Sequence, residues 1–209
     1  LRRWMLTAVA SGVTGISFWV TRAEIAAAEM NGFSLLDSEG ETTERIEEVA
    51  RIGRALNTHP DLFAQPTWPQ APVAILLDEH NYQSCASLLP SEEHLRYSVR
   101  GWHRLLWDLG IPVDFIEASQ LDEAFVTAYA ALVLPFPLAM SEDVAQQLER
   151  YVKCGGHLIS EAAPGRIDEH GYANRGEMSP VMRRLFGVRQ VGFSLIREPD
   201  TLRPRWMPH

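Results

Sequence analysis

The chain has 209 residues, of which 46% are hydrophobic and 22% charged, and this balance is ordinary for a soluble globular protein of one or two domains. Its net charge of −8 argues against a nucleic-acid or anionic-membrane surface, because both favour clustered Lys and Arg. No apolar run approaches the roughly 20 residues that span a bilayer. Two cysteines, Cys85 and Cys154, cannot build a disulfide framework or supply all four ligands of a zinc site. We therefore expect reduced thiols in a cytoplasmic protein.

The first region, residues 1–57, carries one predicted strand between helices. Residues 3–10 are expected to form a helix, and residues 15–20 (GISFWV) a buried strand rich in aromatic and branched side chains. A second helix is expected over 43–56, capped by Thr42 or Thr43. A single strand leaves its backbone groups unpaired, and the sequence begins with Leu1. We therefore interpret this region as part of something longer. The apolar face of the second helix would hold Ile46, Val49, Ala50, Gly53 and Leu56.

Four prolines in NTHPDLFAQPTWPQAP predict a linker over residues 58–71. Beyond it, apolar strands are expected over 72–78, 112–117, 131–135 and 157–161. The helices between them are expected over 91–109, around 121–129, and over 141–154. Continuously apolar strands that alternate with helices indicate a parallel sheet covered on both faces. Right-handed crossovers then predict a doubly wound, flavodoxin-like α/β domain over 72–209.

Chemistry in such a sheet is expected beyond the carboxyl ends of the strands. The turn after the first strand, DEHNYQSCASLLPSEEH, is acidic and lacks glycine, which argues against a phosphate or dinucleotide site. We expect no cofactor. Asp78, Glu79, His80 and the stretch 166–172 fit caps and solvated loops better than a carboxylate–histidine site. Cys85, in this turn, and Cys154, at a helix end, fit small hydrophobic residues better than nucleophiles.

The residues from 12 to 56 resemble a known family. GVTGISFW is followed by Arg22, Glu24 and Glu29, and then by GFSLLDSEGETTERIEEVARIGRAL. This order resembles the end of the (β/α)8 catalytic barrel of glycoside hydrolase family 42 β-galactosidases. There, the eighth strand ends in an aromatic–Trp pair, with an Arg three residues and a Glu ten residues after the Trp, as Trp19, Arg22 and Glu29 are spaced. Many members carry a His three residues after that Glu, where this chain has Gly32.

The second region, with YVKCGGHLI and a late LFGV, looks like the trimerisation domain that follows this barrel. That domain resembles class I glutamine amidotransferases stripped of their nucleophile. The amidotransferases place a Cys on a sharp turn after a central strand, and here that turn, residues 135–138 (PFPL), has no thiol or hydroxyl. The resemblance thus implies a flavodoxin-like, amidotransferase-like domain after the last strand and helix of a (β/α)8 barrel.

The resemblance also implies roles for three residues at the barrel mouth. Trp19 would offer a flat apolar face to a sugar ring, Glu29 would accept hydrogen bonds from sugar hydroxyls, and Arg22 would hold Glu29 or a neighbouring carboxylate through a bidentate pair. The alternative is that Trp19 fills a core and Glu29 lies exposed on a helix. The two catalytic carboxyl groups and the four-cysteine metal site of the family lie on earlier parts of its barrel. We therefore expect neither catalytic nor metal-binding residues in this chain.

The leading hypothesis is an oligomerisation domain that forms a homotrimer, in a parent enzyme that acts on a galactoside-type sugar. Two alternatives remain open: a portion of an intact retaining β-galactosidase that hydrolyses terminal β-galactosides, and a small-molecule-binding α/β module that uses Asp78, Phe136 and Glu161 at the strand ends. Aromatic residues dominate interface energetics, so four are candidates for either the subunit interface or the core: Tyr97, Trp102, Trp107 and Phe136.

Overall fold

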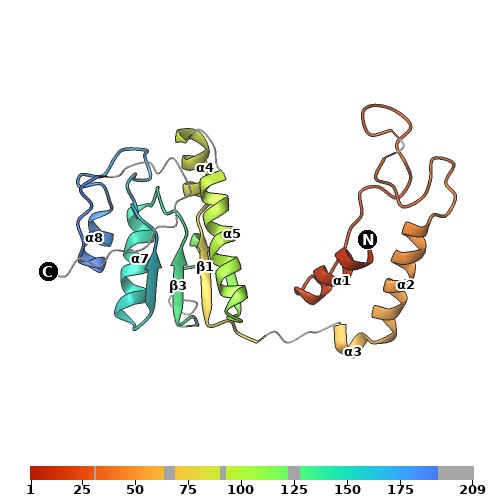
Figure 1. Cartoon of the computed structure of the whole chain (residues 1–209), viewed down its shortest axis with the longest axis horizontal. Helices are drawn as coiled ribbons and strands as arrows, with labels where there is room; N and C mark the ends of the chain where they lie inside the picture. Colours follow the sequence, from red (N-terminus) through yellow and green to blue (C-terminus); the bar gives the residue numbers. More distant parts are fainter. Residues whose placement is uncertain (31, 64–68, 90–92, 122–127, 193–209) are drawn as a thin grey trace. The chain divides into compact units, whose positions relative to one another are not determined.

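The computed structural model describes residues 1–30, 32–63, 69–89, 93–121 and 128–192. It divides into two compact units, Leu1–Pro69 and Gln70–His209, each of which has its own helices (Figure 1). The second unit contains the sheet.

The first unit is built around two helices, α1 (Arg2–Ala10) and α2 (Glu44–Thr58), with a short α3 (Pro60–Phe63) after them. The Thr43 hydroxyl accepts a hydrogen bond from the Arg45 backbone N–H at the start of α2, so the predicted cap is confirmed. Arg2 on α1 donates to Glu48 on α2, with Nη2 2.9 Å from Oε2, and this contact joins the two helices. Both predicted helices of this region are therefore confirmed.

The predicted strand over residues 15–20 is wrong for this structure. Residues 13–18 have no regular secondary structure, and the described part of the first unit contains only an isolated bridge between Glu24 and Met30. The physical reason is that a strand exists only beside a partner that satisfies its backbone N–H and C=O groups. The described residues of this unit provide no such partner for GISFWV.

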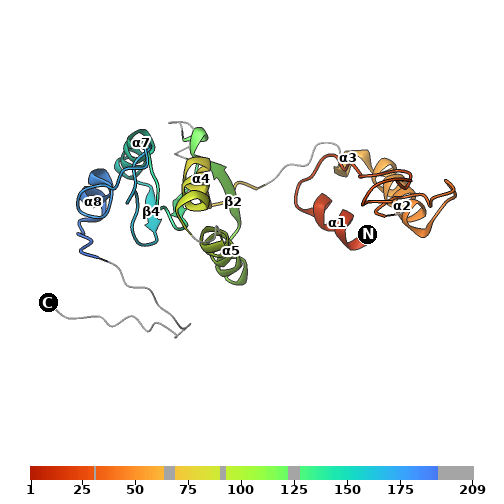
Figure 2. The same ribbon diagram turned by 90° about the horizontal axis from the view of Figure 1, so that it is seen from above.

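The second unit holds four parallel strands in the order β2-β1-β3-β4. They are β1 (Val73–Leu77), β2 (Val113–Glu117), β3 (Ala131–Leu134) and β4 (His157–Ser160). The chain moves outward from β1 in one direction through α5 (Glu93–Asp108) and in the other through α7 (Glu142–Lys153). These two helices lie on opposite faces of the sheet (Figure 2), so the doubly wound α/β prediction is confirmed.

Two apolar layers hold the sheet between its helices. Because side chains alternate along a strand, Ile75 and Val133 pack toward Leu106 of α5, while their neighbours face α7. The α7 side forms the larger core, and the buried Tyr151 hydroxyl donates to the carbonyl of Tyr129 at 3.1 Å. Strands that are apolar on both faces are thus explained by helices on both sides. The larger core includes Ala74, Leu76, Leu132, Leu134, Ala145, Leu148 and Tyr151.

Several elements differ from the sequence-based prediction. The stretch after β1 is not a long turn but begins with helix α4 (Glu79–Leu88), so Cys85 lies buried on a helix rather than in a loop. The Asp78 carboxylate starts this helix by accepting from the His80 backbone N–H at 3.0 Å. The structure adds η1 (Ala118–Gln120) and α8 (Pro180–Phe186). The first two residues of the helix predicted over 91–109 and most of the helix predicted around 121–129 lie outside the described residues.

Candidate functional sites

The first candidate site contains the predicted sugar-contacting residues of the first unit. The Trp19 side chain is 74% exposed, and its indole Nε1 donates a hydrogen bond to Glu29 Oε2 at 3.3 Å. Glu29 lies in a turn rather than on a helix. The structure therefore brings Trp19 and Glu29 together, with the carboxylate at the edge of an open aromatic face.

Arg22 takes a different position from the one expected. Its guanidinium lies beside Gly40, where an added Cβ would stand 3.7 Å from Arg22 Cζ. Within the described residues, no hydrogen bond or ion pair joins Arg22 to Glu29. Gly32 closes the turn by donating its backbone N–H to the Glu29 carbonyl at 3.1 Å. A side chain at this position would start 3.3 Å from that oxygen, so the glycine fits a tight turn.

Residues missed by sequence reasoning organise the loop that follows Trp19. The Leu35 N–H donates to the Val20 carbonyl at 3.0 Å, which returns the chain beside the tryptophan. Arg45 on α2 donates through Nε to the Ser34 carbonyl at 2.5 Å, and Ser34 is buried. A charged donor on a backbone carbonyl is a strong contact, so α2 sets the shape of this loop. The sequence placed Arg45 on a helix but could not show its partner.

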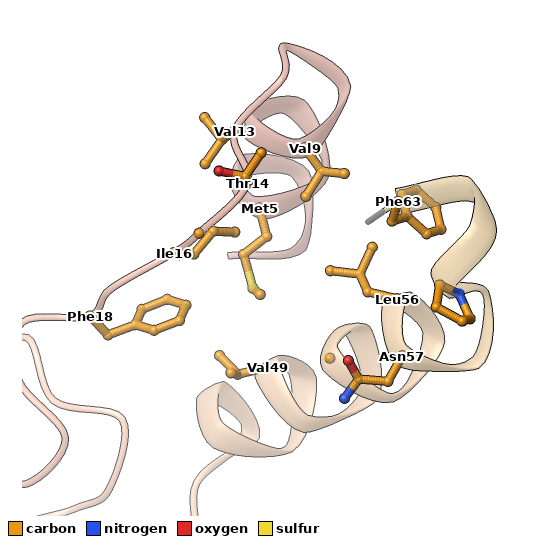
Figure 3. Close-up of a pocket in the computed structure, with 13 residues that line it drawn as sticks. Met5, Val9, Val13, Thr14, Ile16, Phe18, Val49, Leu56, Asn57 and Phe63 are labelled. Atoms are coloured by element: carbon orange, nitrogen blue, oxygen red, sulfur yellow. The ribbon is translucent and has the colours of Figure 1, made fainter. Parts of the chain in front are cut away.

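An open apolar groove of about 570 Å³ lies in the same unit. Figure 3 shows Met5 and Val9 of α1, Val49 and Leu56 of α2 and Phe63 of α3 around this space. The apolar face predicted for α2 therefore lines a groove rather than a closed core. None of its lining residues is ionisable, so the groove offers a packing surface and no acid–base chemistry.

The second candidate site lies at the carboxyl edge of the sheet, around Glu161. Its Oε1 accepts hydrogen bonds from Ser98 Oγ at 2.5 Å and Trp102 Nε1 at 2.7 Å. Its Oε2 accepts from the Phe136 backbone N–H at 3.2 Å. Three donors from α5 and the turn after β3 thus converge on one carboxylate.

The turn after β3 is sharp and carries no nucleophile. Phe136 has φ of +39°, a left-handed conformation that non-glycine residues rarely adopt. The buried Asn81 holds this turn from α4: its Nδ2 donates to the Phe136 carbonyl at 3.0 Å, and its Oδ1 accepts from the Ala139 N–H at 2.9 Å. The backbone geometry of a strained turn is therefore present, but an aromatic ring stands where a thiol or hydroxyl would be needed.

The remaining polar candidates are structural. Burial raises the pKa of the Asp78 carboxyl, which caps α4. Asp168 accepts from the backbone N–H groups of His170 and Tyr172, and these bonds hold its pKa below the usual value. Both carboxylates thus belong to a cap and a loop, as expected.

The two thiols differ in their surroundings. Burial raises the pKa of the Cys85 thiol to about 11, which leaves little thiolate at neutral pH. Cys154 is exposed at the end of α7. Among the residues described, no cluster of His, Cys, Asp or Glu has the makings of a metal site, and no helix in that part of the chain is long and apolar enough to cross a membrane.

The four candidate aromatic residues of the second unit separate into two groups. Trp102 and Phe136 are partly buried and take part in the Glu161 contacts. Trp107 is 70% exposed and Tyr97 63% exposed on α5, so of the two roles that the sequence left open, neither of these side chains takes the one in the core. Trp107 lies on the outer side of the helix, while Leu95 and Leu106 face inward.

Comparison with known proteins gives a consistent family of relatives. Residues 71–206 match the family model described as a β-galactosidase trimerisation domain. The chain is 24% identical over 201 residues to the β-galactosidase GanA of Bacillus subtilis, and 27% identical over 191 residues to the β-galactosidase bgaB of Geobacillus kaustophilus. These matches cover 94% and 90% of the chain but only 28% of each relative.

Solved structures show the same relation. A catalytic mutant of a family 42 β-galactosidase from G. stearothermophilus is 26% identical, with a TM-score of 0.77 over 94% of this chain and 28% of the other. The β-galactosidase from Bacillus circulans sp. alkalophilus shares the fold, with a TM-score of 0.77 at 22% identity, over 94% of this chain and 29% of the other. The likeness extends through both units, so the first unit also has a counterpart in these structures.

Proposed function

Because the chain belongs to the β-galactosidase trimerisation domain family, we propose that it associates as a homotrimer and serves the assembly of a β-galactoside-hydrolysing enzyme. The observation that carries this proposal is the match of residues 71–206 to that domain, on a sheet whose candidate nucleophile position holds Phe136. The chain spans about 28% of the length of its curated relatives. We place the catalytic carboxyl pair in the part of the enzyme that these residues do not represent.

The Glu161 contacts support an assembly role over the alternative of a small-molecule-binding module. A ligand that bound through the Glu161 carboxylate would compete with the three hydrogen bonds that this group already accepts. The Asp78 carboxylate is likewise engaged in its helix cap. The two carboxylates on which the binding-module alternative relies, Asp78 and Glu161, are therefore both engaged in internal contacts.

Native mass spectrometry of mixed subunits tests the homotrimer. The chain is refolded together with a copy that carries an added tag of known mass, so that subunits exchange at random. A trimer yields four masses, from no tagged subunit to three, whereas a dimer yields three and a monomer two. The proposal predicts four masses, and a spectrum with only the two single-chain masses would contradict it.

We further propose that Trp19, Glu29 and Arg22 contribute to the sugar-binding site of the parent enzyme. The exposed indole face supports this role, because aromatic rings pack against the C–H side of sugars, and the Trp19–Glu29 hydrogen bond places an acceptor at its edge. In the chain itself, galactose should shift the NMR signal of the Trp19 indole N–H, which is assigned by its loss in Trp19→Phe. The matched control is the signal of Trp4, which is 79% exposed on α1. Equal shifts of both signals, or none, would count against a sugar site at Trp19.

A further inference from the structure

The loop that carries the Trp19–Glu29 pair is closed at its base by two backbone hydrogen bonds. In both, an N–H group of residues 35–36 donates to a carbonyl of residues 20–21, at 3.0 and 2.8 Å. We call these two bonds the loop clip. Trp19 directly precedes the clip, and Glu29 lies inside the loop that the clip closes. The clip therefore limits how far the loop can carry these two side chains apart.

The two peptide groups that donate to the clip are also bonded to the start of helix α2. The Ser34 carbonyl, which shares a peptide group with the Leu35 N–H, accepts from Arg45 Nε at 2.5 Å. The Leu35 carbonyl, in the next peptide group, accepts from the Thr43 hydroxyl at 2.5 Å. Each of these peptide groups is thus held by a side chain of α2 on one side and by the segment after Trp19 on the other.

Arg45 differs from Thr43 because its donor is charged. A charged donor forms a stronger hydrogen bond, and hydrogen bonds that run through one peptide group polarise and strengthen one another. The guanidinium therefore makes the Leu35 N–H a better donor to the clip. Ser34 is 2% exposed and Leu35 7% exposed, so little water reaches this peptide group to replace Arg45.

The Trp19–Glu29 pair needs such support because it is open to solvent. Trp19 is 74% exposed, and one hydrogen bond of 3.3 Å joins its indole to the carboxylate. A single hydrogen bond contributes little net stability against water, whereas closure of a loop restricts all the residues within it. The position of the carboxylate therefore depends on the clip more than on its own contact with the indole.

We infer that Arg45 is a positioning residue of the proposed sugar site. It holds the loop clip, and the clip keeps the Glu29 carboxylate at the edge of the Trp19 ring. This inference rests on the proposed sugar-binding role and names the residue on which the geometry of that site depends.

Matched substitutions on α2 test this role in the full 209-residue chain. Arg45→Met removes the donor, and Arg45→Lys restores a cationic donor. Arg54→Met makes the same change further along the helix. Both arginines are exposed, so neither change removes core packing, and circular dichroism verifies the fold of each variant. The NMR signals of the Trp19 and Trp4 indole N–H groups are then recorded without and with galactose.

Without sugar, Arg45→Met should move the Trp19 indole signal toward its position in Glu29→Ala, where the hydrogen bond to the carboxylate is absent. The Trp4 signal should not move, because α1 does not contribute to the clip. Arg45→Lys should restore the Trp19 signal, and Arg54→Met should leave it in place. A loss of helix structure alone would move both indole signals.

With galactose, Arg45→Met should raise the dissociation constant measured at Trp19 about tenfold, the size of one charge-assisted hydrogen bond. Arg45→Lys should stay within about threefold of the unsubstituted chain, because its ammonium still donates. A folded Arg45→Met variant that binds galactose as tightly as the unsubstituted chain would overturn the inference and leave the sugar site intact. An unsubstituted chain whose Trp19 signal does not respond to galactose would instead overturn the proposed sugar site, and the inference with it.

Discussion

Removal of the Glu161 carboxylate should destabilise the second unit. In Glu161→Ala, Ser98 Oγ, Trp102 Nε1 and the Phe136 N–H lose their shared acceptor. Hydrogen bonds to a charged group contribute about 1.5–3 kcal/mol each, and a buried donor left unpaired costs about 1–3 kcal/mol. These groups are partly rather than fully buried, so water recovers part of the loss.

We therefore expect a loss of about 3 kcal/mol in the free energy of unfolding. At roughly 2–4 °C per kcal/mol for a chain of this size, the melting temperature should fall by about 10 °C. Glu161→Gln keeps one carbonyl acceptor but turns an amide toward one of the donors, so its loss should be about half as large. The control is Glu79→Ala, an exposed residue in the first turn of α4 that accepts one hydrogen bond, from Gln83 Nε2 at 3.1 Å, and its loss should cost no more than about 1 kcal/mol.

Urea unfolding followed by far-UV circular dichroism measures all three variants. Trp102 fluorescence gives a second signal, because the indole N–H loses its charged acceptor in Glu161→Ala. Equal stability of Glu161→Ala and Glu79→Ala would refute the reasoning. It would mean that the three contacts to Glu161 are replaced by water without cost.

Three further predictions follow from single contacts in the second unit. A Cβ at Gly156 would lie 2.2 Å from the Tyr151 ring, so Gly156→Ala should lower the free energy of unfolding, measured by thermal unfolding, by about 3 kcal/mol. Gly101→Ala on α5, where an added Cβ meets nothing within 4 Å, should raise it by about 0.5–1 kcal/mol. Equal effects of the two substitutions would contradict this packing. Because the Cys85 thiol is buried and has a pKa of about 11, iodoacetamide at pH 8 should label exposed Cys154 and spare Cys85. Mass spectrometry that finds Cys85 labelled first would show that it is not buried. Burial raises the pKa of Asp78 above 3.8, so the ionised carboxylate lowers the stability of the folded state as pH rises through the folded pKa. Asp78→Asn, whose side chain still caps a helix, should therefore be more stable than the unsubstituted chain at pH 7, and this advantage should vanish below pH 3.8. An equal advantage at both pH values would argue against a raised pKa.

The sheet could be predicted because its strands are short, continuously apolar runs bounded by turn residues. Residues 72–78 and 131–135 needed no partner information, since their short length, apolar composition and flanking turn residues together favour a strand buried on both faces. The first helix after the linker was missed for the opposite reason. EHNYQSCASL is polar on most sides and covers little apolar surface, so α4 depends on its Asp78 cap and on Asn81, whose amide bonds to a turn 55 residues away.

The candidate sites show the same division between local and long-range information. The ten-residue spacing from Trp19 to Glu29 was visible in the sequence, and the structure joins these two side chains by a hydrogen bond. The contacts of Glu161 were not visible in the sequence, because the two donors on α5, Trp102 and Ser98, lie 59 and 63 residues away in the chain. The position of Trp107 also required the structure, since a helix that covers a sheet could place a tryptophan on either side.

Multi-angle light scattering of the 209-residue chain is the most direct test of the central claim, that this domain assembles subunits. Measured over a range of concentrations, the molar mass should reach three times the 23.5 kDa of the chain and stay there. A mass that remains at 23.5 kDa at the highest concentration, with the fold intact by circular dichroism, would contradict it.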